Sequence, residues 1–166
     1  MNKVKKIKDN CDMSLNSIEC IFYDFDGVMT DNRVLVDETG KEAVFVNRSD
    51  GYAVSKLKEM GITQAIISTE KNPVVVRRAE KIDIPVINGV GDKDKVIIDY
   101  AKENNIDLTK SIFIGNDLND LPAFEVVGYK GCPKDAAQEI LGVADWISSC
   151  NGGYGVIRDF YSFISR

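Results

Sequence analysis

Two aspartates separated by a single residue form the first group in the chain whose types and spacing suit catalysis. Asp24 and Asp26 follow a run of apolar residues and precede Gly27. Carboxylates this close repel each other unless a cation relieves the repulsion, and Mg²⁺ does so by binding carboxylates together with phosphate oxygens. Asp24 can then attack phosphorus, while Asp26 can protonate the leaving oxygen and later activate water. Taken alone, the same residues also suit a simple turn after a strand.

Three more polar groups follow along the chain, each at the end of an apolar run or the start of a helix. Ser68 ends one such run and can hold a phosphate oxygen. Lys93 opens a predicted helix, with Lys95 as a second candidate, and an ammonium group there can balance the charge of a phosphate. Asn116 and Asp117 follow a further apolar run and suit a metal ion. Each group alone also fits a cap, a turn or a solvated charge, but the four groups together predict phosphoryl transfer with Mg²⁺.

Composition excludes several other kinds of site. The chain has 166 residues and no histidine, which removes the Ser-His-Asp triad, the Cys-His pair and zinc held by histidine. The net charge of −5 disfavours nucleic-acid binding, which needs a basic surface. The four cysteines form no C-x-x-C pair, which is typical of reduced thiols in a cytoplasmic protein. No apolar run is long enough for a membrane helix, and the N-terminus lacks the apolar region of a secretory signal.

The pattern of apolar residues predicts how these groups are positioned. Residues 1–17 form a polar tail, and residues 18–166 form a single domain. The expected strands are 18–25, 62–68, 85–87, 111–114, 128–131 and 146–148. The expected helices are 50–60, 73–81, 92–103, 120–126, 135–141 and a C-terminal helix with Val156, Ile157, Phe160 and Ile164 on one face. Apolar strands alternating with helices predict an α/β fold, a Rossmann-like three-layer sandwich with a mostly parallel sheet.

One hairpin interrupts this alternation. Residues 34–36 and 43–46 flank the turn Asp-Glu-Thr-Gly, which is typical of a β-hairpin. Because the hairpin directly follows the first strand, we expect it to project as a small flap over the carboxyl end of the sheet. Ligand sites of open parallel sheets form at that end.

Over residues 18–163 the chain resembles the haloacid dehalogenase (HAD) superfamily of phosphohydrolases. It is most similar to the small capless branch that holds the 3-deoxy-D-manno-octulosonate 8-phosphate phosphatases and the phosphatase-like C-terminal domains of sialic-acid (acylneuraminate) cytidylyltransferases. The resemblance rests on Asp24-Phe-Asp-Gly-Val-Met-Thr-Asp, Asp50-Gly51, Ser68-Thr-Glu-Lys, Gly89-Val-Gly-Asp-Lys93, Gly115-Asn-Asp-Leu-Asn-Asp120-Leu-Pro and Gly152-Gly-Tyr-Gly-Val-Ile-Arg158.

The resemblance implies a role for each matching position. Asp24 would be the nucleophile and a Mg²⁺ ligand, and Asp26 the general acid and base with its carbonyl oxygen on the metal. Ser68 and Lys93 would bind the transferred phosphoryl group. The hairpin at 33–47 would be the flap. Further metal ligands would be Asn116 and Asp117, and the candidates for contacts to a sugar or its carboxylate would be Arg48, Glu70, Lys71, Arg78 and Arg158.

The implied function is Mg²⁺-dependent hydrolysis of a phosphorylated 3-deoxy-2-ulosonic acid through a phosphoaspartate. The substrate would be an octulosonate 8-phosphate or a sialic-acid-type nonulosonate 9-phosphate. The implied partners are this small phosphosugar acid and three further copies of the chain in a homotetramer that completes the site, with no nucleic acid or membrane. The implied location is the cytoplasm, and the implied pathways are sialic-acid or lipopolysaccharide biosynthesis.

Two departures from the family pattern bear on this interpretation. Asn116 stands where an aspartate usually binds the metal, and Glu70 stands where an arginine usually follows the second strand. The loss of one negative charge should weaken Mg²⁺ binding, and the charge reversal favours nine-carbon ulosonates. An alternative function therefore stays open: a weakly active or inactive oligomerisation or regulatory module associated with a sugar-acid cytidylyltransferase.

Overall fold

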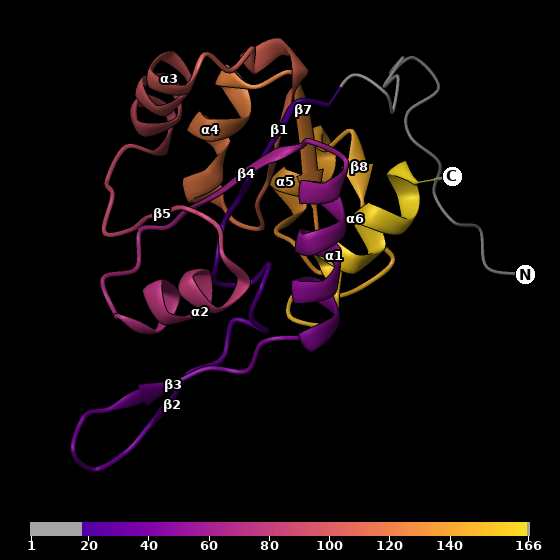
Figure 1. The fold of residues 1–166 in the computed structure, drawn as a ribbon. Helices are drawn as coiled ribbons and strands as arrows, with labels where there is room; N and C mark the ends of the chain where they lie inside the picture. Colours follow the sequence, from indigo (N-terminus) through magenta and orange to yellow (C-terminus); the bar gives the residue numbers. More distant parts are fainter. Residues whose placement is uncertain (1–17, 166) are drawn as a thin grey trace, which may run out of the picture.

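The structure is a computed structural model that describes residues 18–165. The predicted polar tail, residues 1–17, lies outside the described residues. Six parallel strands form the central sheet in the order β5-β4-β1-β6-β7-β8 (Figure 1). The strands are β1 (Cys20–Tyr23), β4 (Thr63–Ile67), β5 (Val86–Ile87), β6 (Ser111–Ile114), β7 (Tyr129–Cys132) and β8 (Trp146–Ile147). The helices are α1 (Arg48–Glu59), α2 (Val74–Ile82), α3 (Lys93–Asn104), α4 (Leu121–Val126), α5 (Gln138–Val143) and α6 (Val156–Ile164).

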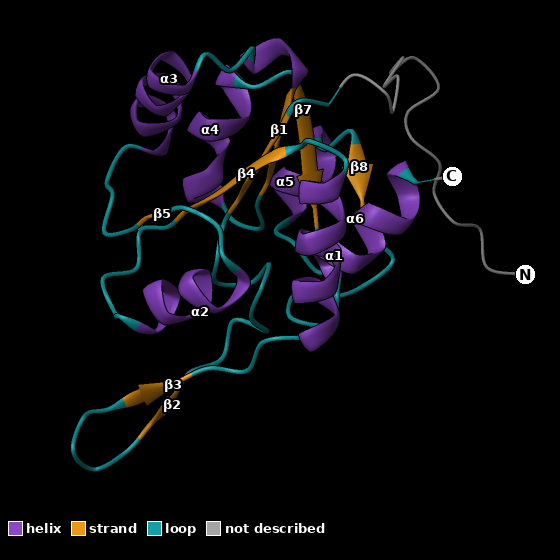
Figure 2. Cartoon of the chain, in the orientation of Figure 1, coloured by secondary structure: helices purple, strands orange, loops and turns teal. Residues whose placement is uncertain are grey.

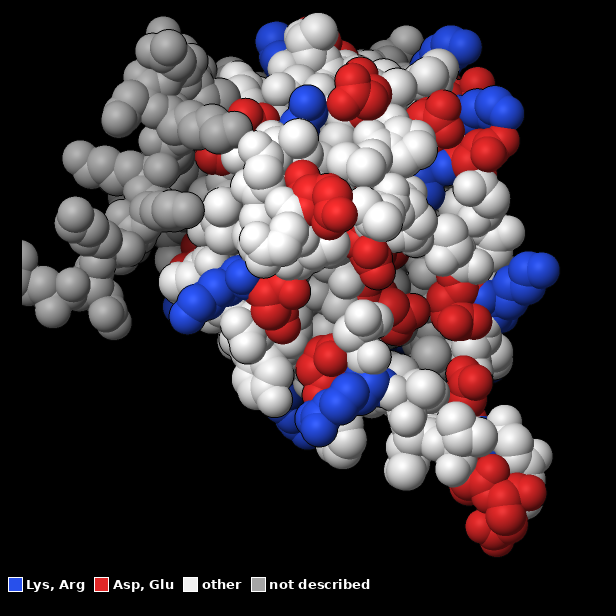
Figure 3. Space-filling view, turned by 180° about the vertical axis from the view of Figure 1, so that it is seen from behind, with Lys and Arg blue, Asp and Glu red and all other residues white. Residues whose placement is uncertain are grey.

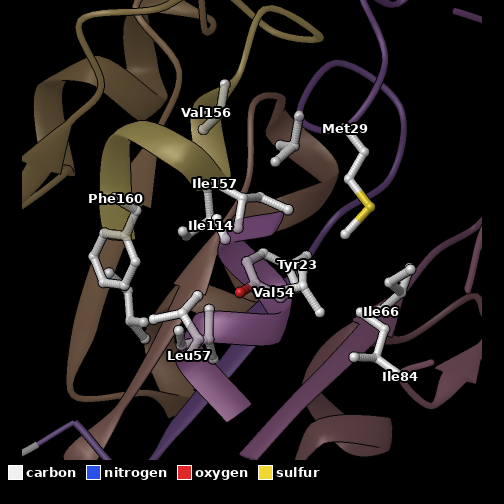
Figure 4. Close-up of a cluster of buried hydrophobic side chains, with 14 of the residues drawn as sticks. Tyr23, Met29, Val54, Leu57, Ile66, Ile84, Ile114, Val156, Ile157 and Phe160 are labelled. Carbon is white, nitrogen blue, oxygen red and sulfur yellow. The ribbon is translucent and has the colours of Figure 1, made fainter. Parts of the chain in front are cut away.

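Helices cover both faces of this sheet, so the predicted three-layer α/β sandwich is confirmed (Figure 2). Successive side chains of a strand point to opposite faces. Ile21 and Tyr23 of β1 therefore pack against α1, α2 and α6, and Figure 4 shows Tyr23 among the buried side chains of this cluster. Cys20 and Phe22 of the same strand pack against α3, α4 and α5. Among the described residues, no helix is both long and apolar enough to cross a membrane.

Strand order places the polar groups of the sequence beside one another. β1 lies between β4 and β6, and Tyr23 is aligned with Ile66 on one side and Ile114 on the other. The chain continues outward from β4 and then returns to the other side of β1 at β6. Such a reversal of strand order opens a crevice at the carboxyl ends of the strands. The residues that directly follow β1, β4 and β6 therefore meet at one edge of the sheet.

The predicted hairpin consists of β2 (Leu35–Val36) and β3 (Glu42–Ala43). It projects away from the body of the molecule (Figure 1), and its tip carries acidic side chains (Figure 3). Both strands are shorter than predicted. The Asp37 side chain accepts the backbone N–H groups of Thr39 and Lys41 and closes the turn. Beyond β3 the chain leaves the hairpin, because Val44 and Val46 pack against the apolar core instead.

Other boundaries differ from the sequence prediction because of local capping. α1 begins at Arg48 and not at Asp50, since the side chain of Asn47 accepts the N–H of Ser49 and caps the helix. α5 begins at Gln138 and not at Asp135. The Asp135 carboxylate instead accepts the N–H of Gly152. A polar side chain that bonds elsewhere competes with helix formation at its own position.

Candidate active site

Asp24 directly follows β1 and is 5% exposed. Its backbone N–H donates to the carbonyl oxygen of Ile114, which extends the pairing between β1 and β6 by one residue. Its Oδ1 accepts the N–H of Phe25 at 2.8 Å and lies 2.8 Å from Nζ of Lys93. Burial and then the charge of Asp120 raise the pKa of Asp24 to about 7, against the lowering effect of Lys93. The strand end thus fixes one oxygen of this carboxylate and leaves Oδ2 for other partners.

Lys93 is buried at the start of α3 and joins two carboxylates. Its Nζ lies 2.6 Å from Oδ1 of Asp120 and 2.8 Å from Oδ1 of Asp24, and it lies over the ring of Phe113. Burial alone would lower the pKa of Lys93, but the two carboxylates raise it, so the side chain is a cation. Lys95, the second candidate, is exposed and pairs with Asp92 on the surface. The structure therefore brings Lys93, and not Lys95, to Asp24.

Asp120 is a member of this cluster to which the sequence analysis gave no role. It is fully buried and pairs with Lys93 through Oδ1. Its Oδ2 accepts the N–H of Asn116 at 2.8 Å and that of Asp117 at 3.2 Å. The spacing in the sequence could have indicated this role. An acidic residue four positions after Asn116, at the start of a helix, can accept hydrogen bonds from the backbone of the preceding loop. Asp120 thereby fixes both Lys93 and the loop after β6.

Asp26 is half-buried beside Asp24. The hydroxyl of Thr30 donates to its Oδ1 at 3.2 Å. Burial raises the pKa of Asp26, the Thr30 hydrogen bond opposes this, and the charges of Glu70 and Glu42 raise it further. A carboxyl group that holds its proton to higher pH is suited to donate that proton to a leaving group.

Three oxygen-bearing groups converge between the loops that follow β1 and β6. One side-chain amide atom of Asn116 lies 2.9 Å from the carbonyl oxygen of Asp26 and 3.2 Å from Oδ2 of Asp24. When this atom is the nitrogen, it donates to both oxygens. When it is the oxygen, three oxygens face one another and require a cation.

The spacing of these groups fits a small cation. Neighbouring ligands of an octahedral Mg²⁺ at its usual bond length are separated by roughly 3 Å, which matches both distances. The arrangement contains one carboxylate, one amide and one carbonyl, and no group of three His, Cys, Asp or Glu side chains suited to a metal occurs among residues 18–165. Asp117 is exposed and uses its Oδ1 to accept the N–H of Leu118.

Ser68 and Glu70 lie in the loop after β4. Ser68 is buried, and its Oγ accepts the N–H of Glu70 at 3.1 Å, so the hydroxyl hydrogen can be donated to another group. Glu70 uses Oε1 to accept the N–H groups of Lys71 and Asn72. The Asn72 side chain donates to Glu42 and ties this loop to the hairpin.

The remaining candidates for substrate contacts separate into two groups. Lys71 is exposed on the loop after β4. The guanidinium of Arg158 lies over the rings of Tyr52 and Tyr161, 4.6 Å and 5.6 Å from their centres. Arg48 and Arg78, in contrast, line a cleft of about 780 Å³.

This cleft lies between α1, α2 and the segment that follows β3, and it is predominantly basic. Phe25, the neighbour of Asp24, is part of its wall. Val44, Val46, Val74 and Ile82 supply apolar surface. The charged lining residues are Arg48, Lys58, Arg77, Arg78, Lys81 and Asp83. The cleft therefore offers an anion-binding surface, which the sequence predicted only through Arg48 and Arg78.

The segment before α6 packs directly against the loop that carries Asp26. An added Cβ on Gly152 would lie 2.1 Å from the carbonyl oxygen of Gly27, which is far inside van der Waals contact. The N–H of Gly153 donates to the carbonyl oxygen of Val28 at 3.0 Å. The C-terminal glycines therefore allow two backbone segments to touch and support the loop after β1.

Comparisons with known proteins agree with this geometry. A family model described as haloacid dehalogenase-like hydrolase matches residues 52–159. The 3-deoxy-D-manno-octulosonate 8-phosphate phosphatase of Haemophilus influenzae is 28% identical over 151 residues, which cover 90% of this chain and 84% of that protein. N-acylneuraminate cytidylyltransferase A of Danio rerio is 26% identical over 140 residues, which cover 83% of this chain but 33% of that protein.

Solved structures show the same fold. A putative HAD family hydrolase from Streptomyces avermitilis matches with a TM-score of 0.88 at 40% identity, over 90% of this chain and 86% of that one. The 3-deoxy-D-manno-octulosonate 8-phosphate phosphatase from Moraxella catarrhalis matches with a TM-score of 0.86 at 29% identity, over 90% of this chain and 87% of that one. The latter structure is a complex with a magnesium ion, a phosphate ion and a KDO molecule.

Proposed function

The chain belongs to the haloacid dehalogenase-like hydrolases and is a phosphatase, and from this premise we propose that it is a Mg²⁺-dependent phosphatase of a phosphorylated 3-deoxy-2-ulosonic acid. The observation that carries the proposal is the convergence of Oδ2 of Asp24, the carbonyl oxygen of Asp26 and the side-chain amide of Asn116, beside a nucleophile already paired with Lys93. A phosphoryl group needs this combination of a positioned carboxylate and concentrated positive charge.

Asp24 Oδ2, the carbonyl oxygen of Asp26 and the amide oxygen of Asn116 would hold the Mg²⁺. When bound, the ion supplies positive charge that reduces repulsion between the nucleophilic carboxylate and the phosphate. Asp117 would assist through water, since its own oxygen caps the next turn. The amide contributes a weaker electrostatic attraction than the usual carboxylate.

The residues of the chain account for both halves of the reaction. Asp24 attacks phosphorus, and a bond from phosphorus to its oxygen forms as the bond to the sugar oxygen breaks. Asp26 donates its proton to that leaving oxygen, then takes a proton from the water that hydrolyses the phosphoaspartate. Ser68 donates to a phosphoryl oxygen, and Lys93 balances the negative charge. Free Asp24 and inorganic phosphate result.

The basic cleft supports an acidic sugar as the substrate. Arginine binds a carboxylate through two parallel hydrogen bonds, and Arg48 and Arg78 both line the cleft. The relatives include a 3-deoxy-D-manno-octulosonate 8-phosphate phosphatase and an N-acylneuraminate cytidylyltransferase, and both names specify a sugar acid. The negative charge of Glu70 raises the pKa of Asp26. A negative charge at this position favours a sialic-acid-type nonulosonate 9-phosphate over the eight-carbon sugar.

The test is phosphate release from octulosonate 8-phosphate and from a nonulosonate 9-phosphate, measured side by side with Mg²⁺ and with EDTA. We expect Mg²⁺-dependent release, faster with the nine-carbon substrate. The variant Asp24→Asn should lose turnover while its circular dichroism stays that of the wild type. Asp31→Asn is the matched control, because this carboxylate on the same loop pairs with Arg33, and a pair with a partner as exposed as Arg33 contributes little. Turnover by Asp24→Asn, or release that persists in EDTA, would contradict the mechanism.

The same experiment decides the alternative function. Asn116 favours a regulatory module that binds the sugar acid without hydrolysing it, because its amide nitrogen can donate to Asp24 and Asp26 in place of a metal. Folded protein that releases no phosphate from either substrate at millimolar Mg²⁺ would support that module. Release restored by Asn116→Asp would identify this residue as the cause.

A further inference from the structure

Asp50 is a buried carboxylate that takes no part in the proposed reaction. It lies in the first turn of α1 and is 1% exposed. Its Oδ1 accepts the N–H of Arg158 at 2.9 Å, so it caps the first turn of α6 from a neighbouring helix. Its Oδ2 is buried with no hydrogen-bond partner among the described residues. A buried carboxylate with only one of its two oxygens hydrogen-bonded lowers the stability of the fold. Such residues often have a functional role.

Arg78 reaches the same turn of α1 from α2. Its Nη2 donates to the carbonyl oxygen of Asn47 at 2.8 Å. The same Nη2 would lie 3.9 Å from a Cβ on Gly51. Its Nε is buried and, like Oδ2 of Asp50, has no hydrogen-bond partner among the described residues. The guanidinium therefore lies against the first turn of α1, which contains Asp50, and Arg78 is also one of the residues that line the basic cleft.

Asp50 is the acidic residue whose charge acts on the Arg78 guanidinium, without a direct ion pair between them. Lys58 pairs with Asp83, and Arg77 pairs with Glu80. Burial lowers the pKa of Arg78 and raises that of Asp50 to about 6, and each group opposes this shift in the other. A half-buried guanidinium among other cations needs such compensation to stay in place.

We propose that Asp50 is a positioning residue that holds the Arg78 guanidinium at the wall of the basic cleft and links it to the first turn of α6. The proposal rests on the proposed function, in which this cleft takes the carboxylate of the sugar acid. The link also reaches the catalytic loop. α6 begins at Val156, four residues after Gly152, which packs against the backbone of Gly27.

Asp50→Asn separates positioning from capping. The amide oxygen can still accept the N–H of Arg158, while the negative charge that acts on Arg78 is removed. The expected result is a KM for the ulosonate phosphate raised about tenfold, which corresponds to roughly 1.4 kcal/mol of binding free energy. The expected kcat and the KM for p-nitrophenyl phosphate, which has no carboxylate, remain those of the wild type. In an Arg78→Ala background, Asp50→Asn should raise KM no further.

Asp159→Asn is the matched control for a purely structural role. Asp159 also lies in the first turn of α6, where its carboxylate accepts the hydroxyl of Ser148 and the N–H of Ser149. It makes none of the contacts of the cleft that are described above. An equal rise in KM in Asp159→Asn would overturn the proposal, because a general loosening of α6 would then explain the effect of Asp50.

A second measurement needs no substrate and so separates this proposal from the proposed function. Urea unfolding of Asp50→Asn, Arg78→Ala and the double variant gives the coupling between the two residues directly. Clearly non-additive effects on the free energy of unfolding would support the link between Asp50 and Arg78. This holds even if Arg78→Ala leaves KM unchanged, because an unchanged KM would count only against the proposed sugar-acid substrate. Additive effects on both unfolding and KM would overturn the link.

Discussion

At the scale of single residues, the balance of charge around Asp24 depends on position 116. Asp24 and Asp120 share the single ammonium of Lys93, and the side chain of Asn116 adds no charge. In the absence of a cation its amide nitrogen can donate to Asp24 and Asp26, so the loops are held together without metal. A carboxylate at this position would instead face Asp24 and require the ion.

The variant Asn116→Asp tests this balance. We expect its Mg²⁺ affinity to rise about tenfold, since an added charge next to a divalent ion contributes on the order of 1–2 kcal/mol even in a partly solvated site. Without Mg²⁺ the variant should unfold at a lower temperature than the wild type, because two carboxylates then repel each other. Calorimetric titration with Mg²⁺ and thermal unfolding in EDTA measure the two effects.

Asp117→Asn is the control for this measurement, because the Asp117 carboxylate caps the following turn and does not contact Asp24. Its effect on Mg²⁺ affinity should be smaller than that of Asn116→Asp and opposite in sign. A loss of affinity in Asp117→Asn that exceeds the gain in Asn116→Asp would assign the third ligand to Asp117.

At the scale of elements, the segment between β8 and α6 determines where the loop after β1 lies. Gly152→Ala should displace this loop, because the new Cβ would lie 2.1 Å from the carbonyl oxygen of Gly27. Forced overpacking of this kind costs about 1–3 kcal/mol, and a shift of about 1 Å at a reacting group costs roughly 100-fold in rate. We expect a stable but strongly impaired phosphatase, measured by urea unfolding and kcat.

Gly142→Ala, a substitution within α5, provides the comparison. An added Cβ there meets nothing within 4 Å, and replacing a helical glycine by alanine stabilises by about 0.5–1 kcal/mol. Its turnover should equal that of the wild type. Wild-type kcat in Gly152→Ala would show that the loop after β1 does not depend on this packing.

The same scale shows what the sequence could predict. Apolar runs predicted the strands β1, β4 and β6. The polar residues at the ends of these runs predicted that Asp24, Ser68 and Asn116 lie together, because parallel strands end at one edge of a sheet. The partners of those residues could not be predicted. In the sequence, Asp120 resembles any acidic residue at the start of a helix. Its pairing with Lys93 follows only from the way the fold brings β6 and α3 together. Asp117 suits a metal by type but caps its own turn.

At the scale of the whole molecule, the hairpin leaves apolar surface uncovered within the described chain. Val34, Leu35, Val36 and Phe45 are between 51% and 74% exposed. An isolated two-stranded hairpin is marginally stable in water, and β2 and β3 have two residues each. An exposed apolar arm of this kind marks a contact between proteins. We expect further copies of the chain to cover it in the homotetramer that the family resemblance implies.

This expectation is tested by the mass of the protein in solution. Phe45→Ser removes the most exposed of these side chains. If the wild-type protein is the expected tetramer, this variant should shift it toward monomer, as measured by light scattering after size exclusion. Val143→Ser, which is 41% exposed on α5, should leave the tetramer intact. If neighbouring copies complete the site, the monomer should lose turnover of the sugar phosphate more than of p-nitrophenyl phosphate, because Asp24, Lys93 and Asp120 all lie within one chain. A wild-type monomer with full activity on the sugar phosphate would show that one chain forms the complete site. The basic cleft would then have to bind the substrate that is hydrolysed by Asp24 of the same chain.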